Sequence, residues 1–252
     1  MQINTLNPYL PLDFSVADSS WHAYLRTGLA AMDQHYLKQL THSSSWLPGS
    51  RKIFNAFSLP LDRVQYVLFG ESPYPRRESA NGYAFWDHAV NALWSSSGLS
   101  KQVNRATSLR NIIKMLLIAE GLLDCSHPTQ ENIARIDKSN LVQTSQALFS
   151  NFLHHGFLLL NATLVLQSHR PQKDVKAWCP FLQYLLDCIL TNRPHITLIL
   201  LGRLANTIDQ LIPTSQVKRL YAMHPYNLAF ISHPQLLSFF KPLHLLRKLQ
   251  KS

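Results

Sequence analysis

One stretch, residues 64–85, constrains the fold of this chain more than any other. Its first six residues, Val-Gln-Tyr-Val-Leu-Phe, are apolar or favour β structure, which predicts a buried strand over residues 64–69. Gly70 ends this strand, and Pro73 blocks its continuation. The sequence therefore predicts a tight loop at the carboxyl end of the strand, with three candidate side chains: Glu71, Ser72 and Tyr74.

Three further short apolar segments predict strands, each separated from the next by a helix-length segment: residues 157–160, 196–201 and 219–223. Strands that alternate with helices imply parallel pairing, with helices covering both faces of the sheet. Each of the four predicted strands ends in polar or conformationally special residues: Glu71-Ser72, Asn161, Gly202-Arg203 and His224-Pro225. Open parallel sheets bind ligands beyond the carboxyl ends of their strands, so these residues predict one pocket.

Apolar residues at helical spacing predict three amphipathic helices. The first spans residues 20–40 behind a serine cap, and the second spans residues 109–123. The third, residues 236–250, carries basic residues among its apolar ones, which predicts a docked helix with a solvated basic face.

The rest of the chain predicts little regular structure. Residues 1–19 are expected to form an extended arm, residues 52–57 a short helix and residues 124–140 a polar loop. A chain of 252 residues can form one α/β domain with a full core, so we expect a single domain over residues 1–252.

The formal charge of +10 favours a polyanionic partner, which could be DNA, RNA or an anionic membrane surface. Charge alone leaves this open, because many basic proteins bind no nucleic acid. Cys125, Cys179 and Cys188 are an odd number without metal-ligand spacing, which favours reduced thiols and a cytoplasmic location. The first residues lack the features of a signal peptide, and no apolar stretch is long enough to span a bilayer.

The loop after the first strand carries two recognisable motifs. Residues 70–75 read Gly-Glu-Ser-Pro-Tyr-Pro, and residues 80–85 read Ala-Asn-Gly-Tyr-Ala-Phe. Together they resemble the uracil-DNA glycosylases, whose first motif is Gly-Gln-Asp-Pro-Tyr-His, followed by Ala-His-Gly-Leu-x-Phe. Residues 106–112 resemble the family's Pro-Ser-Leu-x-Asn-Ile segment, and residues 221–225, Tyr-Ala-Met-His-Pro, its histidine motif.

The resemblance covers nearly the whole chain and implies a three-layer α/β/α fold with a central, mainly parallel four-stranded sheet. It also implies DNA repair by base excision, a hydrolysis of the N-glycosidic bond after the base is flipped out of the DNA. No cofactor or metal is implied. We expect the protein to be a monomer that binds single- and double-stranded DNA and does not associate with a membrane. The sequence does not identify a protein partner.

The resemblance implies base-binding roles for three residues. Phe85 matches the aromatic residue that stacks on the flipped base, and Tyr74 matches the one that fills the space of a thymine methyl group. Asn161 matches the asparagine that reads the Watson–Crick edge of uracil, which suits an amide with both a donor and an acceptor. Read singly, Phe85 would be a core residue and Asn161 a turn residue.

His224 matches the histidine that hydrogen-bonds the oxygen anion developing on the departing base. Residues matching those that contact the DNA backbone or duplex are Ser108, Gly202, Arg203 and Leu228. Arg203 stands where the family has a serine and could hold a phosphate through its charge and fork geometry. Leu228 matches the leucine that wedges into the duplex. Tyr226 replaces a serine that contacts a phosphate.

The departures from the family pattern cluster at the water-activating end of the site: Ser72 replaces the catalytic aspartate, Pro75 a histidine and Asn81 another histidine. A serine hydroxyl carries no charge to stabilise an oxocarbenium ion and is a poor base unless activated. Glu71 could compensate, because a related branch of the superfamily uses a glutamate there. Alternatively, Glu71 is a solvated loop residue, since neighbouring side chains on an extended backbone point opposite ways.

Two classes of function therefore remain open. The first is a uracil-DNA glycosylase-like enzyme with weak or altered activity, using His224 with Glu71 and Ser72. The second is a catalytically inactive family member that serves as a DNA- or protein-binding module.

Overall fold

Four parallel strands form the central sheet of the computed structural model, which describes residues 12–167, 171–212 and 216–249. Their order in the sheet is β4 (Phe157–Asn161), β1 (Tyr66–Gly70), β5 (Thr197–Leu201) and β6 (Lys218–Ala222). Every pair is parallel, with Gly70 beside Asn161 and Leu201 beside Ala222 at the carboxyl ends. The predicted four-stranded sheet is confirmed, with each strand boundary within two residues of its predicted position.

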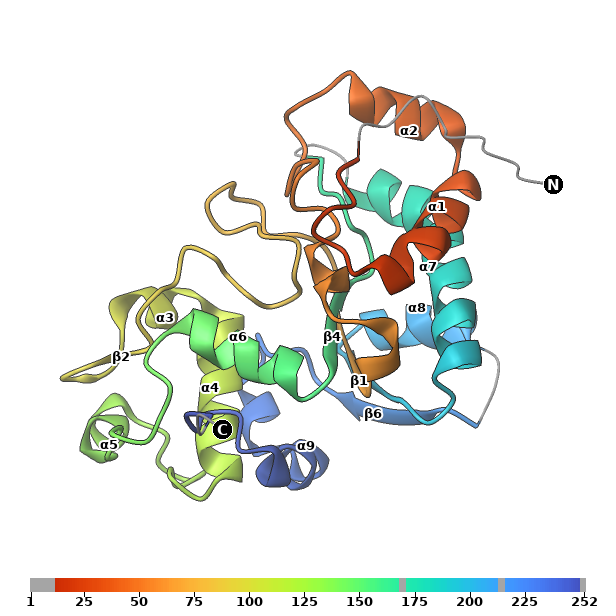
Figure 1. Cartoon of the computed structure of the whole chain (residues 1–252). Helices are drawn as coiled ribbons and strands as arrows, with labels where there is room; N and C mark the ends of the chain where they lie inside the picture. The colour runs from red at the N-terminus through yellow and green to blue at the C-terminus, as the bar shows by residue number, and fades with distance from the viewer. Residues whose placement is uncertain (1–11, 168–170, 213–215, 250–252) are drawn as a thin grey trace.

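Helices cover both faces of this sheet, which gives three layers (Figure 1). Alternate residues of each strand face opposite layers: Val67, Leu158 and Leu198 pack on one side, while Leu68, Leu159 and Ile199 pack on the other. The first layer contains α1 (His22–Ala30), α2 (Gln34–Thr41), α7 (Pro171–Asn192) and α8 (Leu204–Leu211). The second contains α4 (Thr107–Ala119), α6 (Ser145–His154) and α9 (Pro234–Phe240). The α/β/α expectation is therefore confirmed.

The predicted first helix is two helices, preceded by a 3-10 turn, η1 (Ser19–Trp21). The chain breaks before Gln34 because the Asp33 side chain accepts a hydrogen bond from the backbone N–H of His35 and starts a new helix. The expected serine cap is also wrong, since Asp18 caps η1 through the N–H of Ser20.

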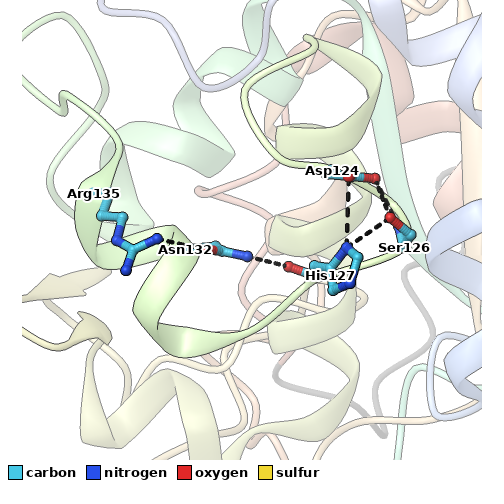
Figure 2. Close-up of polar contacts among 5 residues, drawn as sticks. All are labelled: Asp124, Ser126, His127, Asn132 and Arg135. Atoms are coloured by element: carbon cyan, nitrogen blue, oxygen red, sulfur yellow. Dashed lines mark hydrogen bonds and ion pairs between the residues drawn. The ribbon is translucent and has the colours of Figure 1, made fainter.

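The helix predicted over residues 109–123 is α4, which ends at Ala119. Gly121 takes a positive φ of 71°, which terminates the helix there. The segment predicted to be a loop contains α5 (Gln130–Arg135), capped by the Thr129 side chain. Figure 2 shows the local polar contacts that shape this segment: Asp124 accepts from Ser126, and Asn132 donates to the His127 carbonyl.

The last predicted helix is also shorter than expected. It comprises α9 and a 3-10 turn, η5 (Lys241–Leu243), and His244 then takes a left-handed φ of 46°. Leu245 and Leu246 are buried without helical structure, and the Asn151 side chain holds this segment by donating to the Leu245 carbonyl. Residue 250, the predicted helix end, lies outside the described residues.

Short elements connect the layers. They are η2 (Asn55–Ser58), η3 (Leu61–Arg63), β2 (Trp94–Ser95), β3 (Gly98–Leu99), α3 (Lys101–Arg105) and η4 (Leu228–Ser232). The predicted helix over residues 52–57 is therefore the single turn η2, and most of the predicted arm, residues 1–11, lies outside the described residues. The three cysteines are free thiols. Within the described ranges, no helix is long and apolar enough to cross a membrane.

Candidate active site

The paired ends of β1 and β4 position the Asn161 side chain. Gly70 lies beside Asn161, and a Cβ atom at Gly70 would approach the Asn161 Oδ1 to 2.5 Å. Only glycine leaves room for this amide. Beyond the strand ends, the N–H of Ala162 donates to the Gly70 carbonyl at 2.8 Å, which keeps the two chains together. Asn161 is buried, yet no described residue hydrogen-bonds its side-chain amide, so its donor and acceptor are available to a ligand.

Phe85 is held in a strained backbone conformation. Its φ is +62°, in the left-handed region that non-glycine residues rarely adopt. The Tyr74 hydroxyl donates to the Phe85 carbonyl at 3.1 Å, and Ala84 donates to the Leu159 carbonyl on the adjacent strand. Asn81 also supports this loop, because its side chain accepts from the N–H of Tyr83. Strain of this kind persists only where surrounding contacts enforce it, and it concentrates at functional sites.

The Phe85 ring lies next to the His224 ring. Their centroids are 5.9 Å apart, and the planes are inclined by 44°. Gly202 makes room for His224: its φ is +64°, and a Cβ atom there would lie 2.9 Å from the His224 Cβ. The ends of β5 and β6 therefore bring His224 beside the loop that carries Phe85.

The environment of His224 specifies its tautomer and charge. Its Nδ1 accepts a hydrogen bond from the backbone N–H of Tyr226 at 3.1 Å, so the neutral ring carries its proton on Nε2. Burial lowers the pKa of His224 below its usual 6.5, while the nearby Glu71 carboxylate opposes this shift. The result is a neutral imidazole whose Nε2–H can donate to a ligand at neutral pH.

Tyr74 is fixed and neutral. Burial raises the pKa of its phenol, and the Asp87 carboxylate raises this pKa further. Arg76 forms an ion pair with Asp87 at 3.3 Å, and Arg77 donates to the Ser44 carbonyl at 3.2 Å. Both arginine side chains therefore have protein partners.

Glu71 and Ser72 have different environments. Ser72 is half-buried, and its hydroxyl makes only a long contact of 3.5 Å with the Pro73 carbonyl. Glu71 is exposed and lines a cavity together with Arg203 and His224. The carboxylate that acts on His224 thus belongs to Glu71.

The segment around His224 presents three exposed apolar side chains, Met223 before it and Tyr226 and Leu228 after it. Leu228 is 61% exposed, Tyr226 72% and Met223 49%. Large apolar residues gathered on one loop indicate an interaction surface. Sequence reasoning selected Leu228 but did not select Met223, and it treated Tyr226 only as a lost phosphate contact.

Asn111 was missed as a positioning residue. It is buried, and its side-chain amide donates to the Pro225 carbonyl at 2.6 Å, which fastens α4 to the loop after His224. Ser108 lies half-buried in the first turn of the same helix. The available signal was a polar side chain on the otherwise apolar face formed by Leu109 and Ile112.

Arg203 lies at the N-cap of α8 and is exposed. No described residue forms a hydrogen bond or ion pair with it, so its guanidinium is available to an anion. Within the described residues, no group of three or more His, Cys, Asp or Glu side chains is arranged to hold a metal ion.

No protein-family model matches the chain, but comparisons with known proteins and solved structures find similar ones. It is 28% identical over 217 residues to a uracil-DNA glycosylase of Azobacteroides pseudotrichonymphae, which covers 82% of this chain and 83% of that protein. A uracil-DNA glycosylase of Amoebophilus asiaticus is 28% identical over 215 residues, covering 82% of each chain.

Solved structures extend the likeness. The crystal structure of wild-type UNG from Nitratifractor salsuginis matches with a TM-score of 0.88 and 38% identity, over 94% of this chain and 96% of that one. Mimivirus uracil-DNA glycosylase matches with a TM-score of 0.60 and 15% identity, over 86% of this chain and 72% of that one. At that identity the mimivirus structure shares the fold alone.

Proposed function

Because this chain belongs to the uracil-DNA glycosylase superfamily, we propose that it excises uracil from DNA, with activity weakened or altered by Ser72. The observation that carries the proposal is the juxtaposition of Phe85 and His224, whose ring centroids are 5.9 Å apart, at the same sheet edge as the unpartnered Asn161 amide. These three groups offer a flipped base a ring face, a hydrogen-bond donor and a reading amide.

The leaving group is the part of the reaction that these residues support best. Cleavage of the N-glycosidic bond leaves negative charge on the departing base. In this proposal the Nε2–H of neutral His224 donates to the oxygen on which this charge develops. A preorganised donor in a site shielded from water stabilises that charge without further reorganisation. Tyr74, fixed by its bond to the Phe85 carbonyl, fills the side of the pocket where thymine carries its methyl group.

The sugar side of the reaction lacks the family's aspartate. Ser72 carries no charge, so a group that opposes the positive charge of the sugar and orients water must come from elsewhere. We assign this role to Glu71 or to a water molecule held near Ser72. Support for Glu71 is that it lines the same cavity as His224 and that its carboxylate raises the pKa of His224 against the effect of burial.

We further propose that the chain acts as a single-domain monomer over residues 1–252, on single- and double-stranded DNA, without a cofactor. The formal charge of +10 supports DNA binding. Arg203 would hold a phosphate, with Gly202 and Ser108 beside the strand. Leu228, 61% exposed, would enter the space left by the flipped base.

A second candidate function is a catalytically inactive member that binds DNA or a protein. Support comes from Ser72, Pro75 and Asn81, which stand where the family has an acid and two histidines. Asn81 has acquired a structural role, since its side chain accepts from the N–H of Tyr83.

Single-turnover excision on labelled single-stranded and duplex DNA carrying one uracil tests the proposal. We expect free uracil from the unmodified protein and a loss of about 10²-fold or more in His224→Ala, the usual cost of removing one donor to an oxyanion. His35→Ala, an exposed histidine on α2, is the matched control and should retain the parent rate. DNA binding without any release of uracil would favour the second candidate.

A further inference from the structure

A cleft of about 730 Å³ opens beside the candidate active site, between α7 and α8. The two helices lie side by side (Figure 1), joined where the Gln183 side chain donates to the Leu211 carbonyl at 2.8 Å. Apolar side chains from both helices and from two strands form its walls: Val175, Leu182, Leu204, Leu211, Phe69 and Leu201. Its size falls within the range of small-ligand pockets, and its lining suits a flat apolar surface.

The cleft is continuous with the candidate active site. Glu71 and His224 line it, and His224 is also in ring contact with Phe85. The cleft therefore lies within reach of a nucleotide adjacent to one held at His224.

The rim of the cleft combines positive charge with an aromatic side chain. Lys176, Arg203 and Tyr226 line it, all exposed, and no described residue forms a hydrogen bond or ion pair with their side chains. Among the described residues that line the cleft, Glu71 is the single acidic one. Cationic side chains that follow a phosphate backbone, with an aromatic ring for stacking, are the usual elements of single-strand binding.

We propose that this cleft binds the unstacked nucleobase next to the excised one, with Tyr226 against the base and Lys176 and Arg203 on the flanking phosphates. The inference rests on the proposed function, because it requires the uracil nucleotide to occupy the site beside His224. It assigns to Tyr226 a base contact in place of the phosphate contact of a serine.

The test measures affinity for short single strands by fluorescence anisotropy. Each strand carries one 2′-fluoro-2′-deoxyuridine, whose electron-withdrawing fluorine disfavours the oxocarbenium ion and so prevents cleavage. Two further strands lack the base of the nucleotide on the 5′ side or on the 3′ side. We expect removal of one of these two bases to weaken binding about five- to hundredfold, the usual range for one stacked base. Removal of the other should have little effect.

Thr207→Trp fills the cleft with a neutral side chain from an exposed position that lines it, on α8. Asn206→Trp makes the same change at the adjacent exposed position, which does not line the cleft. The quantity compared is the ratio of the affinities of the strands with and without the neighbouring base. In Thr207→Trp we expect this ratio to fall to one, whereas Asn206→Trp should keep the ratio of the unmodified protein. A Thr207→Trp ratio that equals or exceeds the parent ratio would overturn the proposal.

A strand with thymidine in place of the uridine distinguishes failure of the cleft proposal from failure of the proposed function. Tighter binding of the uridine strand, together with no effect of either neighbouring base, would overturn the cleft proposal and leave the proposed function standing. Equal binding of the uridine and thymidine strands would contradict the proposed function, and the cleft proposal would fall with it.

Discussion

At the scale of single residues, His224 is held by contacts that determine its chemistry. The Tyr226 N–H occupies Nδ1, and burial disfavours the imidazolium. Protonation would add a hydrogen to Nδ1, which would then face the Tyr226 N–H that now donates to it. A protonated ring also carries a positive charge in a desolvated position. The same contacts therefore fix the tautomer and keep the ring neutral.

This arrangement predicts how His224 titrates. Its pKa should lie below 6.5, and Glu71→Gln should lower it further, because the Glu71 carboxylate favours the charged ring. NMR titration of the ring protons measures this pKa in the absence of turnover. Excision by the unmodified protein should decline as the pH falls through that pKa, because the ring then becomes charged.

Glu78→Gln serves as the charge-matched control, since Glu78 is an exposed glutamate on the same loop. It should leave the His224 titration where it is in the parent. An upward shift of the His224 pKa in Glu71→Gln would contradict the placement of Glu71 beside the ring.

At the scale of elements, the site depends on contacts between segments distant in sequence. Asn111 on α4 holds the loop after His224 through the buried Pro225 carbonyl, at 2.6 Å. Asn111→Ala leaves that carbonyl without its partner, so we expect the free energy of unfolding to fall by about 1–3 kcal/mol. Because the loop then loses its anchor, uracil excision should fall by more than DNA affinity does.

Chemical denaturation and single-turnover kinetics measure the two effects. Lys114→Ala is the control on the same helix, because Lys114 donates to the Pro128 carbonyl, away from this loop. A normal excision rate in Asn111→Ala would show that the contact serves stability alone.

The sheet and its polar ends could be predicted from the sequence because short apolar runs followed by glycine or polar residues are local signals. The break at Asp33 could not, since apolar spacing continues through both α1 and α2 while the cap depends on one side-chain hydrogen bond. The helix α5 was missed because its polar composition resembles a loop. The early end of α9 followed from Pro242 and the left-handed His244, which apolar periodicity alone does not register.

The candidate site was predictable to a similar degree. Asn161 ends β4 and His224 follows β6, so their shared location was implied by the parallel topology. The role of Asn111 depends on a partner, Pro225, that is 114 positions away in sequence. The α7–α8 cleft depends on how two helices pack, so no local pattern indicates it.

At the scale of the whole molecule, the charge of +10 predicts DNA binding that weakens steeply with salt. Each phosphate neutralised contributes a log–log slope of about −0.9 on duplex DNA and about −0.7 on single strands. Arg203→Ala should make this slope less steep by roughly the contribution of one phosphate contact. The reason is that Arg203 is exposed and has no partner among the described residues.

Arg77→Ala is the control, since Arg77 is engaged with the Ser44 carbonyl, and its slope should match that of the parent. Anisotropy titrations over a series of salt concentrations give these slopes. A parent slope indistinguishable from zero would contradict electrostatic binding of DNA.

The central claim is that base recognition and leaving-group stabilisation are retained while the group facing the sugar has been lost. The most direct test is single-turnover uracil excision by Ser72→Asp. An oriented carboxylate there should lower the barrier by a few kcal/mol, at about 1.4 kcal/mol for each tenfold in rate. We predict excision well above that of the parent, and loss of the gain when His224→Ala is added. If Glu71 already supplies the carboxylate, Ser72→Asp should instead give little gain, and Glu71→Gln should silence the parent. No uracil release by either the parent or Ser72→Asp, on single-stranded or duplex DNA, would contradict the account and leave the binding module in its place.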